Sequence, residues 1–65
     1  MEYTNSQIGL LIDEYIHSAR DREIMKRRLV DGVRFEPLAE EFDISVIQAK
    51  RIVKREKALL FSKLI

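Results

Sequence analysis

The chain has 65 residues, a formal net charge of +1, no cysteine and one proline. A chain of this length is expected to form a single domain, residues 1–65, close to the lower size limit for folding without cross-links. The lack of cysteine excludes disulfides and thiolate metal sites, and two glycines with one proline leave little room for a fold built on tight β-turns.

Nothing in the sequence points to a membrane or to secretion. No run approaches the roughly 18 consecutive apolar residues of a transmembrane helix. The N-terminal Met-Glu-Tyr-Thr-Asn lacks the basic start and the apolar core of a signal peptide. We therefore expect a cytoplasmic protein with no membrane partner.

Helical periodicity predicts a first helix that begins after Thr4, Asn5 or Ser6, any of which can cap it. Its apolar residues recur at intervals of three and four and should form one buried side. These residues are Ile8, Leu11, Ile12, Tyr15 and Ile16.

A second helix is predicted over about 20–30, with Ser18 or Asp21 as its cap. Asp31-Gly32 should end it, because glycine accepts the left-handed conformation that closes a helix. The basic run Lys26-Arg27-Arg28 near its end has two interpretations. It is either a second phosphate contact or a set of solvated charges that suits the helix dipole.

A third, short helix should begin at Phe35, with Pro37 in its first turn, where a missing amide hydrogen is tolerated. Leu38, Ala39 and Phe42 fall on one face of this helix. The turn Asp43-Ile44-Ser45 follows, and Ser45 is the natural N-cap of the next helix.

The last helix should start at Val46 and run to about Leu64, and its two sides differ in character. With Ala49 as reference and about 100° per residue, one side carries Ile52, Val53, Glu56 and Leu60, which we expect to face inward. The opposite side carries Ile47, Lys50, Arg51, Lys54 and Arg55. One helix would therefore hold the domain together and present a basic surface.

Charge is distributed unevenly along the chain. Residues 1–44 carry six bases against ten acids, a net charge of −4, whereas residues 45–65 carry six bases against Glu56 alone, a net charge of +5. A local basic surface of this kind is typical of groove binding to nucleic acid. The alternative is that these cations only solvate an exposed face.

Together these features predict an all-α fold: a small bundle of about four helices, without strands or a wing, with a helix-turn-helix over about residues 35–55. Two helices joined by so short a turn cross steeply, and the second then projects from the body. A projecting basic helix suits the major groove of double-stranded DNA.

The run from Arg20 to Arg55 resembles region 4, the promoter-reading C-terminal domain of sigma-70-type sigma factors, and its stand-alone phage and mobile-element relatives. The resemblance rests on an R-x-E-I helix, the Asp31-Gly32 stop, an aromatic residue at Phe35, the segment LAEEF, an I-S turn and the segment KRIVKR. The chain has no room for the core-polymerase-binding and melting regions of a complete sigma factor. The resemblance therefore implies a small sigma-like transcriptional regulator.

In that family the helix after the turn enters the major groove of the −35 promoter element, and the preceding helices contact the DNA backbone and the polymerase. The resemblance implies that Val46, Ile47, Gln48, Lys50 and Arg51, with Ser45 at the turn, approach bases or nearby phosphates. It further implies phosphate contacts for Lys54 and Arg55 and backbone contacts for Arg34 and Phe35. RNA polymerase becomes a candidate partner beside DNA.

Two positions depart from the family pattern. Asp43 stands where such turns often carry glycine, although aspartate tolerates positive φ better than most residues. Val46 and Ile47 replace the polar or charged residues that usually begin the recognition helix. These apolar side chains either touch thymine methyl groups or contact a protein. The alternative function is therefore an adaptor or inhibitor that binds RNA polymerase or another helical partner without reading DNA.

The apolar tail also has two interpretations. Leu59, Leu60, Phe61, Leu64 and Ile65 are too many for one helical face. Phe61, Leu64 and Ile65 either form an interface, with a homodimer through the C-terminal helix as one candidate, or fold back onto the first helix.

No enzyme, metal or cofactor is expected. His17 is the single histidine, Gly9 and Gly32 are isolated, and the acidic pairs Asp13-Glu14 and Glu40-Glu41 are sequence neighbours that point apart on a helix.

Overall fold

The computed structural model describes residues 3–63, and it is all-helical. The four helices are α1 (Asn5–Tyr15), α2 (Ala19–Leu29), α3 (Phe35–Glu41) and α4 (Val46–Lys63). No strand occurs within this described range. The predicted helix count and order are confirmed, and the predicted helix boundaries differ by no more than a residue or two.

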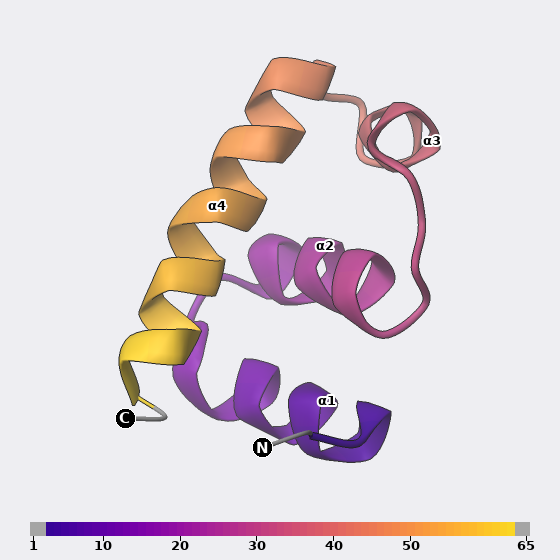
Figure 1. Cartoon of the computed structure of the whole chain (residues 1–65). Helices are drawn as coiled ribbons and strands as arrows, with labels where there is room; N and C mark the ends of the chain where they lie inside the picture. Colours follow the sequence, from indigo (N-terminus) through magenta and orange to yellow (C-terminus); the bar gives the residue numbers. More distant parts are fainter. Residues whose placement is uncertain (1–2, 64–65) are drawn as a thin grey trace.

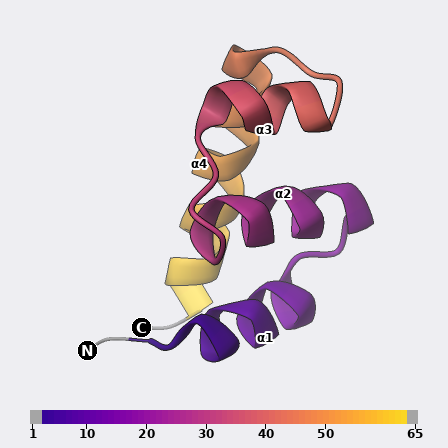
Figure 2. The ribbon, with the colours of Figure 1, turned by 90° about the vertical axis from the view of Figure 1, so that its right-hand side faces the viewer.

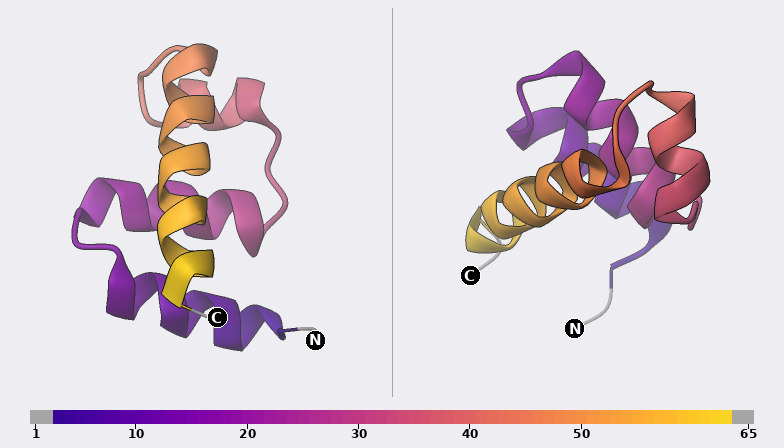
Figure 3. Two further views of the ribbon diagram at one scale, coloured as in Figure 1. Left: turned by 60° about the vertical axis from the view of Figure 1, so that its left-hand side comes forward. Right: turned by 90° about the horizontal axis from the view of Figure 1, so that it is seen from above.

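Helices α1, α2 and α3 lie one above another, and α4 runs along one side of all three (Figures 1 and 2). The 18 residues of α4 give it a length of about 27 Å. That length nearly equals the longest dimension of the molecule, 31 Å. The first turn of α4 lies beside α3 and its last turns lie beside α1, and two further views show the same arrangement (Figure 3).

Side-chain caps fix where the helices begin. The Thr4 hydroxyl accepts a hydrogen bond from the Gln7 amide, and the Gln7 side chain accepts one from the Thr4 amide, which makes a reciprocal capping box at α1. Ser18 caps α2 by accepting from the Asp21 amide. Gly32, with φ of 72°, turns the chain away after α2.

The turn between α3 and α4 is closed by hydrogen bonds from both helices. Asp43 has φ of 55°, its amide donates to the Glu40 carbonyl at 3.2 Å, and the Ile44 amide donates to the Ala39 carbonyl at 3.0 Å. This pair of bonds is a Schellman motif at the end of α3. On the other side, Ser45 and Gln48 cap each other reciprocally, each amide donating at 3.0 Å to the other's side chain. The predicted roles of Asp43 and Ser45 are confirmed.

The core lies where α4 meets the other three helices. Its buried apolar residues come from every helix and from the α1–α2 connection, and they are Ile12, Ile16, Ile24, Met25, Leu38, Ile52, Val53 and Leu60. Ala39 and Ala49 are also buried, and their small side chains let α3 and α4 approach closely. The predicted inner side of α4 is confirmed, including Glu56, which is only 8% exposed.

The C-terminal turns of α4 lie beside α1. Leu60 is buried and α4 contacts α1, whereas Phe61 remains 48% exposed. Leu64 and Ile65 lie outside the described residues. Among residues 3–63, no helix has the length and apolar character needed to cross a membrane.

Candidate nucleic-acid interface

The outward face of α4 carries cations on both flanks of an apolar centre. Ile47 lies at this centre near the start of the helix and is 65% exposed. Lys50 and Lys54 lie on one flank, Arg51 and Arg55 lie on the other, and all four are exposed. Each flank borders a different depression in the surface, and the two depressions are lined by different residues.

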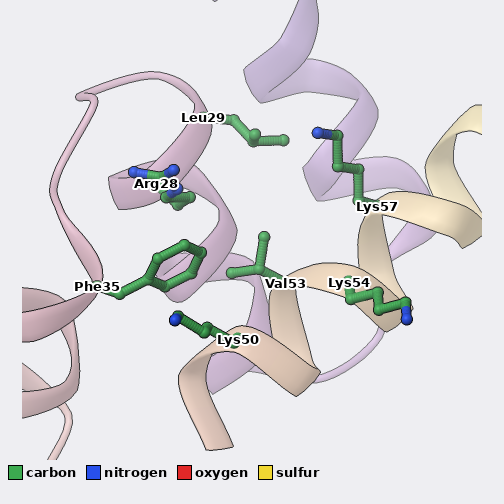
Figure 4. A pocket seen from close by; sticks show the side chains of 7 residues that line it. All are labelled: Arg28, Leu29, Phe35, Lys50, Val53, Lys54 and Lys57. Carbon is green, nitrogen blue, oxygen red and sulfur yellow. The ribbon is translucent and has the colours of Figure 1, made fainter. Parts of the chain in front are cut away.

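The lysine flank borders a cleft between α4 and the segment from the end of α2 to the start of α3. We call it the lysine cleft; its volume is about 570 Å³. It is lined by Arg28, Leu29, Phe35, Lys50, Val53, Lys54 and Lys57 (Figure 4). Four of these seven residues are cationic and none is acidic, so the cleft is a concave, positively charged surface.

At one end of the lysine cleft, two cations lie over the aromatic ring of Phe35. The guanidinium carbon of Arg28 lies 4.3 Å from the centroid of the Phe35 ring, and the Lys50 ammonium lies 5.7 Å from it. Cations are attracted to the negative face of an aromatic ring at such distances. Arg28 also donates a hydrogen bond of 3.0 Å to the Val33 carbonyl. Phe35 therefore packs against the core and also positions cations from two helices.

The arginine flank borders a smaller groove, which we call the arginine groove, with a volume of about 180 Å³. It is lined by Arg20, Ile44, Gln48, Arg51, Ile52 and Arg55. Arg51 makes no hydrogen bond or ion pair among the described residues, so its guanidinium is available to a ligand.

Arg55 differs from Arg51 because it is held by carboxylates of the protein itself. Its guanidinium donates to Asp21 at 2.9 Å and lies 3.5 Å from Glu56. The Asp21 side chain is only 5% exposed and also pairs with Arg20 at 3.3 Å. Arg55, predicted as a phosphate contact, therefore has an internal structural role, joining α4 to α2.

The first turn of α4 supplies fewer free polar groups than the sequence suggested. Ser45 and Gln48 use their side-chain oxygens for the capping box, which leaves the Gln48 amide nitrogen as the free group of that pair. Val46 is half-buried, so Ile47 is the apolar residue that faces outward. Arg34 is the exposed N-cap residue of α3 but makes no side-chain cap.

The basic run lies in the last turn of α2, where cations suit the helix dipole, and each of its side chains also has a partner within the protein. Lys26 pairs with Asp13 at 2.7 Å, and Arg27 pairs with Glu41 at 3.0 Å and Asp31 at 3.1 Å. The hydrogen bonds to Glu41, and then those to Asp31, raise the pKa of Arg27 above its ordinary value. Arg28 is the member of the run that lines the lysine cleft.

Sequence reasoning missed two cations close to the outward face of α4, one on α4 and one on α2. Lys57 lies in the lysine cleft, and its spacing of three and seven residues from Lys54 and Lys50 was a signal that could have identified it. Arg20 reaches the arginine groove from α2, and no local spacing indicates that contact.

No protein-family model, no curated protein and no solved structure matches this chain. Within residues 3–63, no group of three or more potential metal ligands comes together.

Proposed function

We propose that this protein binds double-stranded DNA by placing α4 in the major groove, as a small sigma-like transcriptional regulator. In this proposal α3, the turn and α4 act as a helix-turn-helix. The observation that carries it is the outward face of α4, where exposed Lys50, Arg51 and Lys54 have no acidic partner among the described residues.

The dimensions of α4 support this docking. A helix with its side chains is about 10–12 Å across, and the major groove of B-DNA is about 12 Å wide. The first turns of α4 project beside α3 with Ile47, Gln48 and Arg51 outward. Arginine can bond guanine bidentately, and an apolar side chain can contact a thymine methyl group.

Charge placement also supports the proposal. The net charge of +1 is too small for binding by overall attraction alone. Glu41 of α3 pairs with Arg27 of α2, and Asp21 of α2 pairs with Arg55 of α4, whereas Lys50, Arg51 and Lys54 pair with no acid among the described residues. The positive potential is therefore concentrated on one helix, which is the footprint expected of groove binding.

The test is an electrophoretic mobility shift, with duplexes first enriched from a random pool. The double variant R51A/K54A should lose at least about tenfold in affinity, since each tenfold requires only about 1.4 kcal/mol. Neither side chain packs in the core, so the helical circular dichroism should not change. The control K26A/K63A removes the same charge from outside the outward face and should bind as the wild type does.

Equal affinities for R51A/K54A and the wild type would rule the proposal out. Binding should also weaken as salt rises, because cations on α4 displace counterions from phosphates. An affinity for duplex DNA that does not depend on salt would argue equally against this use of the surface.

A second candidate function rests on the exposed apolar residues of α4. Ile47 and Phe61 are 65% and 48% exposed, an arrangement that also fits a protein partner such as RNA polymerase. An adaptor of this kind would enrich no sequence from random duplexes but would retain a polymerase subunit in a pull-down. The variant I47S should abolish that retention.

A further inference from the structure

The lysine cleft differs from the outward face of α4 because more than one helix contributes cations to it. Two helices contribute the cationic side chains that line it: α2 contributes Arg28, and α4 contributes Lys50, Lys54 and Lys57. Its remaining lining residues, Leu29, Phe35 and Val53, are apolar. A concave site with several cations and no acid favours a ligand with more than one negative charge.

Not all of the cations that line the cleft are directed into it. Lys50 points toward Phe35 and Lys57 toward Leu29, whereas Lys54 extends away from both (Figure 4). Arg28 is held by the Phe35 ring at 4.3 Å and by the Val33 carbonyl at 3.0 Å. Because Arg28 is already fixed, binding an anion there costs less conformational entropy than ordering a free side chain.

The residue types on the two flanks of α4 also differ in what they can recognise. Lysine is a compact point charge that binds phosphate well but lacks the planar fork of donors that arginine offers to a base edge. Arginine, on the opposite flank, carries a planar fork of donors suited to bidentate bonds with guanine. The cleft therefore has the chemistry of sequence-independent backbone binding.

We propose that the lysine cleft, formed by Arg28, Lys50 and Lys57 beside Phe35, is a site for consecutive backbone phosphates of one DNA strand. This inference rests on the proposed function and assigns a role to Arg28 and Lys57, which lie outside the first turn of α4. A strand held there runs along the lysine flank while the arginine flank faces the base edges.

The salt dependence of duplex binding tests this assignment. If Arg28, Lys50 and Lys57 each neutralise one phosphate, the logarithm of affinity falls with the logarithm of salt with a slope of about −2.7 from these three cations. A fourfold rise in salt then weakens binding about fortyfold. In K57A the slope becomes about −1.8 and the same rise weakens binding about twelvefold.

Two further variants serve as matched controls. K63A removes the same charge from the same helix outside the cleft, and its slope should equal that of the wild type. K57R keeps the charge and should keep the slope. The affinity of K57A should fall by the same factor for an enriched duplex and for its scrambled counterpart, because a phosphate contact carries no sequence information.

The outcomes separate this inference from the proposed function. A wild-type protein that binds no duplex overturns both. Duplex binding with an unchanged slope in K57A, or a loss confined to the enriched sequence, overturns the cleft assignment alone. The phosphate in the cleft could instead come from a free anion. Titration of the protein with inorganic tripolyphosphate, without DNA, tests for this. Tight binding that K57A abolishes, with DNA affinity unchanged, would make the cleft a site for a free anion and overturn the assignment to a DNA strand.

Discussion

Replacing Arg55 with alanine should destabilise the fold, although this side chain is 65% exposed and lies on the predicted DNA-binding face. Arg55 donates to Asp21 at 2.9 Å, and the Asp21 side chain is only 5% exposed. Once Arg55 is removed, Arg20, at 3.3 Å, is the remaining cation paired with that carboxylate. A nearly buried charge would thus keep only its longer and weaker ion pair.

The expected magnitude lies between two limits. A hydrogen bond to a charged group contributes about 1.5–3 kcal/mol, and a solvent-exposed ion pair about 0–1 kcal/mol. Because one partner is nearly buried and the other is mostly exposed, we expect R55A to cost about 1–2 kcal/mol. A domain of 65 residues has a total stability of about 3–10 kcal/mol, so this loss is substantial.

The assay is urea unfolding followed by far-ultraviolet circular dichroism, applied to a double-mutant cycle of R55A, D21A and R55A/D21A. For a slope of about 1 kcal/mol per molar urea, R55A should lower the midpoint by about 1–2 M. The coupling energy between the two positions should be about 1 kcal/mol. R51A, which removes a guanidinium without an internal partner, should change stability by less than about 0.5 kcal/mol.

A coupling energy indistinguishable from zero would refute this reasoning. Arg55 would then be free to contact a ligand, as the family resemblance implies. The cycle therefore also decides whether a DNA-binding defect in R55A reports a lost contact or a weakened fold.

Three further predictions concern helix propensity, a helix cap and a residue with positive φ. G9A should raise the free energy of unfolding by about 1 kcal/mol, and Tm by about 4–8 °C, because the added Cβ has no atom within 4 Å to clash with and alanine favours the helix. S45A should lower stability by about 1 kcal/mol through loss of the α4 cap, whereas S45D should restore it; equal urea midpoints for S45A and the wild type would contradict this. D43A should lower stability by about 1–2 kcal/mol because φ is 55°, and D43G should not lower it; a D43G midpoint below that of D43A would show that φ is not the cause.

Local features of the fold could be predicted because their causes lie within a few residues of sequence. Ser45 and Asp43 were identified at the α3–α4 turn from side-chain chemistry and from tolerance of positive φ. The inner side of α4 followed from helical periodicity, which placed even Glu56 correctly. These predictions required no knowledge of which helices pack together.

Pairings between distant charges could not be predicted in the same way. Arg55 and Asp21 are separated by 34 positions, and Arg27 and Glu41 by 14. With 12 bases and 11 acids in the chain, periodicity identifies exposed charges but does not choose their partners. Periodicity therefore predicted which cations of α4 are exposed, whereas the internal role of Arg55 and the cation–aromatic arrangement of Arg28 with Phe35 required the tertiary structure.

The turn between α3 and α4 is hydrogen-bonded to both helices, which limits how far the two helices can move relative to each other. Both ends of this connection are hydrogen-bonded, by the Ile44 amide on one side and the Ser45 hydroxyl on the other. The two helices therefore form one rigid unit, and binding a partner would cost little conformational entropy in the turn between them. A modest contact area can then yield useful affinity.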